Sequence, residues 1–520
     1  MIENEPANAI APDPGITAGE ATASPAAPKI KAKTNTDFFK VRLRQSQLRA
    51  YSILKTFNVN NTSPPFVKKG RFNYVLAVMS RSGATSKPKG GVFAPVSAAA
   101  WKKSVERDLR GSDYENLVWK PAGAFPDAPI EIEPFYCPEN MKGLSLFPAP
   151  PPGTFPYTRE TSAWEVCEDI PPSSPAASAR MAREAVEGGA EGVLFREAKA
   201  NTPAQISKLL SGIDPARTGV RFAPKGTGIA QARALAEFFE ESGVKKPRGF
   251  VLCDPLGAGK PGEMKSLAAI VKEFDKTAGG FGCVGVRAAE FHEAGAEPVE
   301  EAAFALALGA EYLCALSALG TPHRAAARAM VFHFAVGSAF FLEAAKIRAA
   351  RAVWAHIVEK FDRRADGRMT VHATPSAINK PADDPETNIL RATCETMAAV
   401  AGGGGSISVP AYDAACAPPS ARSQAVSRNI QLILRDECGL GAVADPCAGS
   451  YYADTLTDKV ADAVLNLFLE IEKRGGFARC MKDGFISGRL KRSAKLRAER
   501  VSSGEETLVG VNKYRAGGAK

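Results

Sequence analysis

Residues 219–256 read GVRFAPKGTGIAQARALAEFFEESGVKKPRGFVLCDPL, and this stretch decides the fold class. It begins and ends with short apolar runs, 219–224 and 249–256, which have the length of buried strands. Between them Leu235, Phe238 and Phe239 recur at helical spacing, and a glycine follows as a typical helix stop. The pattern predicts a strand, a helix and a second strand, the unit from which parallel sheets are built.

The same alternation continues on both sides of this unit. The predicted strands are 163–170, 192–197, 219–224, 249–256, 282–288, 331–335, 369–373 and 404–409. Eight strands, each followed by a helix, predict a (β/α)8 TIM barrel of the α/β class, and an open doubly wound sheet is the alternative. Further helices are expected at 421–436 and 458–473, after the eighth strand.

Composition and periodicity divide the chain into four regions. Residues 1–92 are expected to be a largely disordered basic extension: 1–36 show no hydrophobic period, and 37–92 hold one short basic helix, at about 37–57, before a Gly/Ser/Lys linker. Residues 93–160 should hold a helix at 98–110 and extended chain that wraps onto the barrel. The barrel and its C-terminal helices are expected at 161–484, and a basic C-terminal arm at 485–520.

Composition also limits the class of protein. With 45% hydrophobic and 23% charged residues among 520, the chain is globular. No apolar run approaches the roughly 18 residues of a membrane span, so we expect no membrane association. The N-terminus carries acidic residues before any Lys or Arg, unlike a secretory signal. Ten cysteines without a CxxC motif favour a cytoplasmic protein with reduced thiols.

The net charge of +10 lies at the two ends of the chain. Residues 1–75 carry +6 and residues 485–520 another +6, which leaves the body near −2. A basic end could bind nucleic acid, and a nucleic-acid module attached to a barrel is a third hypothesis. Because the globular body itself is not basic, no nucleic-acid partner is expected.

The common catalytic and metal motifs are missing from the sequence. Residues 257–260 read GAGK, but Asp254 and Pro261 stand where a phosphate loop needs Gly and Ser or Thr. The five histidines show no HExxH spacing, no Cys/His cluster has zinc spacing, and no GxSxG elbow occurs. We therefore expect no metal site.

One histidine follows the fifth predicted strand. Residues 290–295 read EFHEAG, which resembles the DxHxxG box through which some proteins supply a cobalt ligand to cobalamin, with Glu in the first place. Active-site loops of barrels follow the strands, so we expect His292 to be a polar residue of the barrel mouth rather than a cobalt ligand.

Several segments strongly resemble the barrel domain of the methylmalonyl-CoA mutase family. The clearest are FLEAAKIRAAR at 341–351, DPETNILR at 384–391, ETMAAV at 395–400 and ADPCAGSYY at 444–452. The resemblance spans roughly 95–515. It implies a barrel that binds a CoA ester along its axis and a C-terminal domain that carries adenosylcobalamin, which together interconvert methylmalonyl-CoA and succinyl-CoA. It also implies Tyr157 and Arg159 as substrate-binding residues and His292 as the one catalytic position that is kept.

The chain departs from the family pattern in its pocket motifs. At 160–170 it reads ETSAWEVCEDI, where the catalytic subunits have a basic and aromatic run that contacts CoA. At 402–410 it reads GGGGSISVP, where they have Gln, His, Thr and Asn side chains. The sequence also ends at Lys520, where the linker to the cobalamin domain is expected to begin.

With these departures, the sequence resembles the small subunit of heterodimeric mutases. The resemblance implies a non-catalytic chain whose partner is a large cobalamin-binding subunit. Adenosylcobalamin is then expected in the partner and not in this chain. The alternative is a catalytic acyl-CoA mutase barrel that works with a separate small cobalamin-binding subunit. The acidic residues at strand one oppose this alternative, and the retained His292 favours it.

Overall fold

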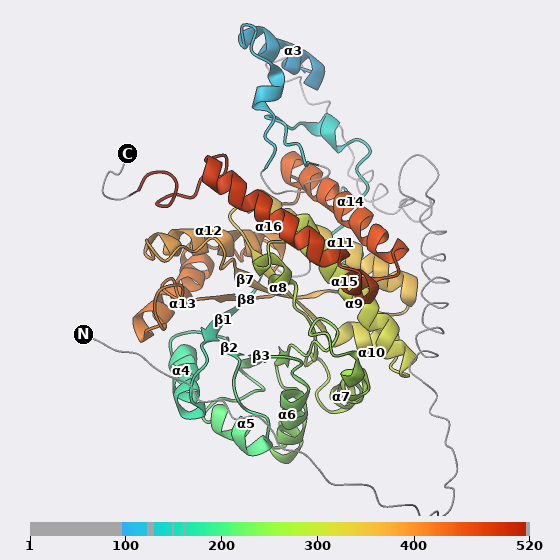
Figure 1. Ribbon diagram of the computed structural model, residues 1–520, viewed down its shortest axis with the longest axis vertical. Helices are drawn as coiled ribbons and strands as arrows, with labels where there is room; N and C mark the ends of the chain where they lie inside the picture. Colours follow the sequence, from blue (N-terminus) through green and yellow to red (C-terminus); the bar gives the residue numbers. More distant parts are fainter. Residues whose placement is uncertain (1–95, 122–128, 148–149, 160–162, 516–520) are drawn as a thin grey trace, which may run out of the picture. The chain divides into compact units, whose positions relative to one another are not determined.

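The computed structural model describes residues 96–121, 129–147, 150–159 and 163–515 of the chain, and the predicted extension 1–92 lies outside them. Figure 1 shows a central set of strands surrounded by helices. The strands are β1 (Glu165–Ile170), β2 (Gly192–Arg196), β3 (Gly219–Ala223), β4 (Gly249–Val251), β5 (Val284–Val286), β6 (Met330–Val336), β7 (Thr370–Pro375) and β8 (Ser406–Val409). All eight coincide with predicted strands.

The sheet closes into a barrel. Every pairing between neighbouring strands is parallel, and the order is β4-β3-β2-β1-β8-β7-β6-β5. Since β1 pairs with β8, the first and last strands are neighbours, which an open doubly wound sheet does not allow. A parallel bridge between Phe250 and Gly282 joins β4 to the chain entering β5. The predicted (β/α)8 barrel is confirmed.

One glycine is required where β3 pairs with β4. Gly249 opens β4 with a φ of +124°, and a Cβ at this position would lie 1.8 Å from the carbonyl oxygen of Val220 on β3. A larger residue would therefore be strained and would also push the two strands apart.

The helices cover the outside of the barrel. They are α4 (Pro175–Glu187), α5 (Pro203–Leu209), α6 (Ile229–Glu241), α7 (Met264–Thr277), α8 (Ala288–Glu293), α9 (Pro298–Ala318), α10 (His323–Arg328), α11 (Phe340–Phe361), α12 (Thr387–Gly402) and α13 (Ala421–Leu432). After β8 come α14 (Tyr451–Lys473), α15 (Phe477–Lys482) and α16 (Phe485–Ser503). The helix predicted from residue 458 begins earlier, at Tyr451, because the Ser450 hydroxyl caps it by accepting from the Ala453 amide.

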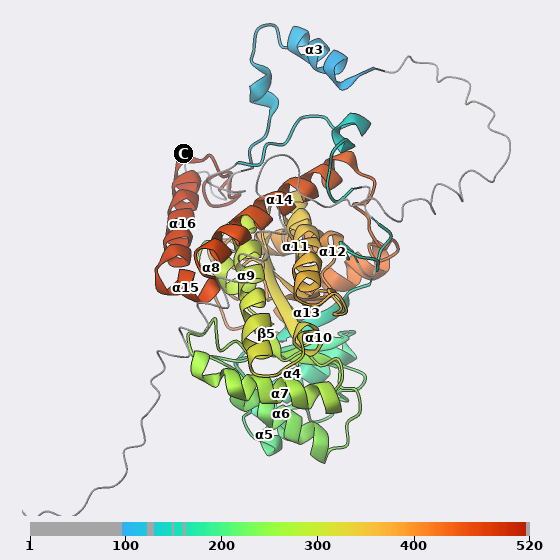
Figure 2. The same ribbon diagram turned by 90° about the vertical axis from the view of Figure 1, so that its right-hand side faces the viewer.

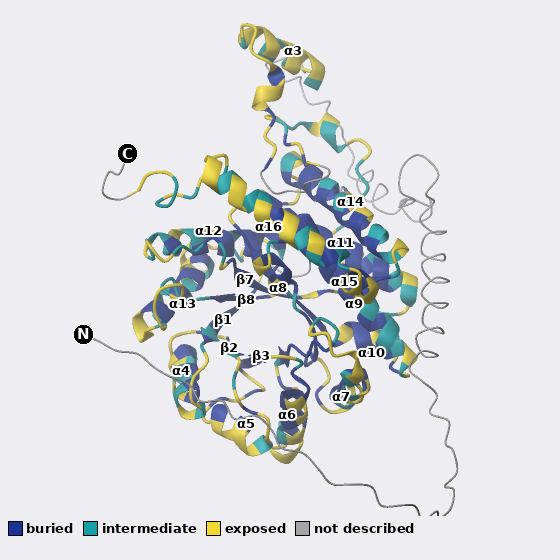
Figure 3. Ribbon diagram, in the orientation of Figure 1, coloured by how far each residue is buried: buried dark blue, intermediate teal, exposed yellow. Residues whose placement is uncertain are grey.

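Helix α9 is apolar on nearly all sides because other helices enclose it. It is long and apolar enough to cross a membrane by length and composition, at a mean hydropathy of 1.3, although no such run was expected from the sequence. However, 72% of its most apolar window is buried inside the protein. Figure 2 shows α9, α11 and α14 lying together, and Figure 3 shows α9 and α11 largely buried. This burial is typical of a core helix.

The chain before the barrel forms an arm, here defined as residues 96–147 where they are described. It begins with α3 (Ala98–Asp108), and Trp119 then pairs with Ile132 in a short antiparallel bridge. The arm is fixed to the barrel helices at its end, where the amides of Ser145 and Leu146 both donate to Asp458 of α14 at 2.9 Å.

The C-terminal helix α16 lies against the N-terminus of α9. Arg489 pairs with Glu300 at 3.1 Å, and Arg500 pairs with Glu297 at 2.8 Å. Part of the basic charge at this end of the chain is thus used in ion pairs with the barrel helices.

Candidate functional site

The barrel axis is filled by side chains. Residues on a strand alternate between the inside and the outside of a barrel, and the inward positions of β1, β2, β4 and β6 carry large residues here. Cys167, Leu194, Phe250, Leu252 and Val331 form an apolar cluster of their own, and each is at most 3% exposed. These five side chains pack against one another across the axis.

Inward positions of β6, β7 and β8 form a chain of polar contacts beside this cluster. His372 bonds the Ser406 hydroxyl through Nδ1 at 2.8 Å and the Ser408 hydroxyl through Nε2 at 3.0 Å. Thr374 then joins Ser408 at 3.1 Å to His333 Nε2 at 2.9 Å. Burial lowers the pKa of His372 well below its usual value and that of His333 to about 3, so both rings are neutral.

A buried ion pair closes the end of the axis at the start of the strands. Arg221 of β3 is 3% exposed and pairs with Glu165 of β1, which also pairs with Arg248. The Arg221 guanidinium lies 5.6 Å from the centre of the Phe250 ring. Burial lowers the pKa of Arg221 to about 9. Desolvated arginine is stable only when paired, so Glu165 holds this closure in place.

The opposite end of the barrel is hollow. A cavity of about 620 Å³ lies at the carboxyl ends of the strands, where active sites of barrels lie. Arg196, Arg287 and His333 reach it from inward positions, and Glu290 and Glu293 reach it from α8. This size and mixture of apolar and charged walls suit a small ligand.

The charges in this mouth cavity are largely paired with one another. Arg196 donates through Nε to both carboxylate oxygens of Asp169, at 2.6 and 2.7 Å. Arg287 pairs with Glu290 at 3.1 Å, and Glu168 pairs with Arg428 of α13. The acidic residues at strand one that the sequence singled out thus neutralise arginines of this chain.

His292 lies behind the wall of the mouth cavity and is not among the residues that line it. Its Nε2 meets the Ser376 hydroxyl at 2.7 Å, and its Nδ1 lies 3.7 Å from Glu301. Burial and the nearby ammonium of Lys346 lower the pKa of His292 well below its usual value. This contact ties α8 to the loop after β7. The ring faces a second cavity of about 60 Å³ beneath α16.

Tyr157 and Arg159 lie at the other end of the barrel, where the strands begin. Arg159 is 3% exposed and donates to the carbonyls of Ala444 at 2.6 Å and Ala401 at 3.0 Å, and also to that of Val400. The Tyr157 carbonyl accepts from Arg351 at 3.2 Å. The structure does not bring either residue together with His292 or with the mouth cavity.

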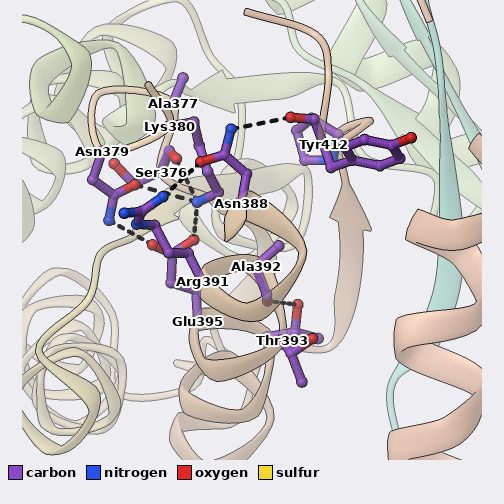
Figure 4. A network of polar contacts seen from close by, with 12 residues as sticks. Ser376, Ala377, Asn379, Lys380, Asn388, Arg391, Ala392, Thr393, Glu395 and Tyr412 are labelled. Carbon is purple, nitrogen blue, oxygen red and sulfur yellow. Dashed lines mark hydrogen bonds and ion pairs between the residues drawn. The ribbon is translucent and has the colours of Figure 1, made fainter. Parts of the chain in front are cut away.

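The motifs that carried the family resemblance make contacts within the protein. In Figure 4, Asn388 of α12 donates to the carbonyl of Tyr412, and Asn379 and Lys380 both contact Glu395. The contacts of Asn379 and Lys380 join the loop after β7 to α12, and the contact of Asn388 joins α12 to the loop after β8.

A second motif makes a buried ion pair of the same kind. The Arg348 side chain, on α11, is 1% exposed and binds Asp445 and Asp454, which flank the start of α14. Removing either partner of such a pair lowers the free energy of unfolding, so a structural role accounts for these residues.

The fold, with a cavity at the carboxyl ends of its strands, defines a barrel of the kind that enzymes and their non-catalytic relatives share. A family model described as methylmalonyl-CoA mutase matches residues 201–520. The chain is 31% identical to a methylmalonyl-CoA mutase small subunit of Porphyromonas gingivalis over 81% of this chain and 70% of that protein. The chain belongs to the methylmalonyl-CoA mutase family.

Two further relatives are longer than the matched region. A methylmalonyl-CoA mutase of Cereibacter sphaeroides is 30% identical over 80% of this chain, and the match spans 64% of that protein. The mitochondrial methylmalonyl-CoA mutase of Homo sapiens is 30% identical over 80% of this chain, and the match spans 60% of it. The chain thus spans less than two thirds of these two relatives.

The sequence did not single out Arg196, Arg287 or His333 as residues of the mouth. A signal was present, because Arg196 and Arg287 lie near the carboxyl end of predicted strands and His333 lies in the middle of another. Arginine is rare inside strands, and three polar residues at equivalent heights around a barrel point to one cavity.

Proposed function

We propose that this chain is a non-catalytic subunit of an adenosylcobalamin-dependent methylmalonyl-CoA mutase, completed by a larger cobalamin-binding subunit. The packed barrel axis is the observation that carries the proposal. The resemblance implies that the catalytic barrels hold a CoA ester along this axis. Here Phe250, His372 and Arg221 occupy it, and each is at most 3% exposed.

Electrostatics at the mouth favour the same conclusion. The phosphates of CoA need unpaired cations or backbone amides. At strand one this chain presents Glu168 and Asp169, and the arginines beside them are already paired with these carboxylates. A phosphate group would have to compete with these carboxylates for Arg196 and Arg428 in order to bind them, which is unfavourable.

The described residues do not fit adenosylcobalamin either. A cobalt ligand must present a free ring nitrogen on an open surface, but His292 and His372 are at most 6% exposed and bond serine hydroxyls. The mouth cavity has the size of a pocket for a small ligand, well below that of a corrin with its nucleotide. We therefore assign the cofactor to the partner and no step of the reaction to this chain.

Two further observations support the proposed partner and cellular location. One curated relative is named as a small subunit, which supports a larger partner. All ten cysteines are free, and this supports a reducing, cytoplasmic location. In this assembly the barrel would stabilise its partner without performing chemistry.

The alternative function is a catalytic barrel that works with a separate small cobalamin protein. The mouth cavity is the observation that favours it, because Arg196 and His333 line a hollow at the catalytic end of the barrel. This alternative requires substrate to enter without passing along the packed axis.

Titration calorimetry with methylmalonyl-CoA tests the proposal. We expect no binding by the isolated chain below about 1 mM, and binding by the complex with the larger subunit. Free CoA and methylmalonate serve as separate titrants. Micromolar binding of methylmalonyl-CoA by the isolated chain would overturn the non-catalytic assignment. Mutase activity of the chain with only a small cobalamin protein would establish the alternative.

A further inference from the structure

Three polar residues form a connected corner of the mouth cavity. Asp169 lies near the end of β1, Arg196 ends the neighbouring strand β2, and Gln424 lies on α13, which packs beside β1 (Figure 1). All three line the cavity. Asp169 joins the other two, because its carboxylate accepts from Arg196 and its backbone carbonyl accepts from Gln424 Nε2 at 3.4 Å. We refer to these three residues as the Asp169 corner.

The Arg196 guanidinium keeps one end open. Its Nε donates to both carboxylate oxygens of Asp169, whereas its two terminal nitrogens form no hydrogen bond with any described residue. The side chain is 36% exposed, so this end can be reached from the cavity. The carboxylates of Asp169 and Glu293 raise the pKa of Arg196, and the open end therefore carries its full charge. Parallel N–H groups of arginine match the two oxygens of a carboxylate.

Gln424 presents an unused acceptor to the same cavity. The residue is 7% exposed. The Asp169 carbonyl can accept only from an N–H group, so its contact with Nε2 fixes the orientation of the amide. The side-chain oxygen at the other end accepts no hydrogen bond from the part of the chain that the structure describes. Because a polar atom without a partner in such a wall is unfavourable, a donor that enters the cavity would be bound here.

The rest of the cavity adds negative charge and an apolar floor. Glu293 of α8 accepts from the Ala377 amide at 3.1 Å but makes no ion pair with a described residue. The lining holds five carboxylates and three Lys or Arg side chains, a formal balance of −2. Leu252, Ala335 and Val409 supply apolar surface. An apolar floor with a few polar groups is the usual construction of a site for a small molecule.

These features select a ligand that carries both charges. A carboxylate on Arg196 would also lie near Asp169, the repulsion that opposes a phosphate at this place. An ammonium group in the same ligand offsets that repulsion by binding the oxygen of Gln424 and facing the negative lining. The two open ends lie close together, since one residue contacts both side chains. An α-amino acid has its carboxylate and ammonium on the same carbon atom and so matches this spacing.

We propose that the Asp169 corner binds a free α-amino acid with an aliphatic side chain. The ligand carboxylate binds the terminal nitrogens of Arg196, the ammonium binds Gln424 Oε1, and the side chain packs on the apolar floor. This inference goes beyond the proposed function and does not rest on it, because the site lies within one chain and uses neither the partner nor the cofactor. In a non-catalytic subunit such a ligand would be an effector and not a substrate.

Titration calorimetry of the isolated, unsubstituted chain tests the ligand class. The probes are L-leucine and two analogues that each lack one charged group, 3-methylbutylamine and 4-methylpentanoate. We expect a Kd below about 1 mM for L-leucine and a Kd at least tenfold higher for each analogue. An analogue that binds as tightly as L-leucine would overturn the assignment to an amino acid. No binding of L-leucine at about 10 mM would overturn the site.

Variants test the location of the site. Arg196→Met and Gln424→Leu should each raise the Kd for L-leucine at least tenfold. The matched control is Arg328→Met, on α10, because Arg328 pairs with Asp275 and its side chain is 46% exposed. We expect the control to change the Kd less than twofold. Unchanged binding by both corner variants would show that L-leucine binds elsewhere and would overturn the proposal.

A second measurement on the unsubstituted chain does not depend on the variants folding. Hydrogen exchange is compared with and without saturating L-leucine. We expect protection in the loops that border the corner, at 171–174, 197–201 and 418–422, and none at 320–328. Protection confined to other segments would overturn the site. None of these outcomes decides the proposed function, because L-leucine is no CoA ester and methylmalonyl-CoA is titrated separately.

Discussion

The rings of Phe250 and His372 meet inside the barrel at 5.2 Å between centres, nearly edge to face. They come from β4 and β7, on opposite sides of the barrel, so their contact spans the axis. Because neutral imidazole and phenyl rings pack well in this geometry, the contact is a stable part of the core. The fold of the mutase family is kept here with its axis closed.

Replacing Phe250 by alanine should leave a cavity inside the barrel. We expect Phe250→Ala to lower the free energy of unfolding by about 3–5 kcal/mol, as for other buried phenylalanines. Chemical denaturation measures this loss, and Phe135→Ala in the isolated chain is the exposed control, with an expected loss below about 1 kcal/mol. Equal losses in the two variants would show that the axis is not packed.

The ion pair at the start of the strands should be costly to break from one side. Glu165→Ala leaves Arg221 buried with no adjacent carboxylate, and we expect a loss of about 3–5 kcal/mol in the free energy of unfolding. The double variant Glu165→Gln, Arg221→Met removes the buried charge as well, so it should be more stable than Glu165→Ala. The prediction fails if the double variant is the less stable of the two in urea denaturation.

His333 should make stability depend on pH. Its pKa is about 3 in the folded protein, below the usual value near 6.5, so the unfolded chain takes up the proton first as pH falls. Its contribution to the free energy of unfolding is complete above pH 6.5. This contribution is lost towards pH 3, by about 1.4 kcal/mol for each pH unit. The positive charges of Arg196 and Arg287, which face the ring, lower the pKa of His333 further.

The variant His333→Asn isolates this effect. Glu301 and Glu395, whose pKa values burial raises to about 7, titrate in both proteins and cancel in the difference. We expect the stability difference between wild type and variant to shrink steadily between pH 6.5 and pH 4.5. A difference that is constant over this range would show that His333 is not buried in its neutral form.

His292→Ala should leave the activity of the complex unchanged. The side chain bonds Ser376 behind the cavity wall, so we expect its loss to cost about 2–5 kcal/mol of stability, from the lost hydrogen bond and the cavity left behind, and no catalysis. Mutase assays of the complex, with the Tm of each preparation, measure both effects. Activity that falls more than tenfold at an unchanged Tm would mean that this chain takes part in the reaction.

The sequence allowed the barrel to be predicted because each strand is a short apolar run beside a periodic helix. The start of α14 was less certain, because residues 451–458, YYADTLTD, mix polar and apolar residues without a clear helical period. The burial of α9 by neighbouring helices could not be predicted, since a helix that is apolar on all sides shows no amphipathic period.

The candidate site was only partly accessible from sequence. The acidic residues at strand one were identified, but their arginine partners Arg428 and Arg196 lie far away in the chain or on another strand. Tyr157 and Arg159 carry a family motif, and a motif does not distinguish a ligand contact from a buried structural contact. Only the geometry separates them, by placing Arg159 among the backbone carbonyls.

The contacts of Arg159 also bear on how the protein is made. Its guanidinium binds a carbonyl 285 positions later in the chain. At about 5–20 residues per second, a ribosome needs roughly 15–60 s to deliver that partner after Arg159 is made. During this interval Arg159 and the chain around it lack this partner at the end of the barrel. The segment around Arg159 therefore waits for this partner until the C-terminal third is made, and slower synthesis of that third would prolong the wait.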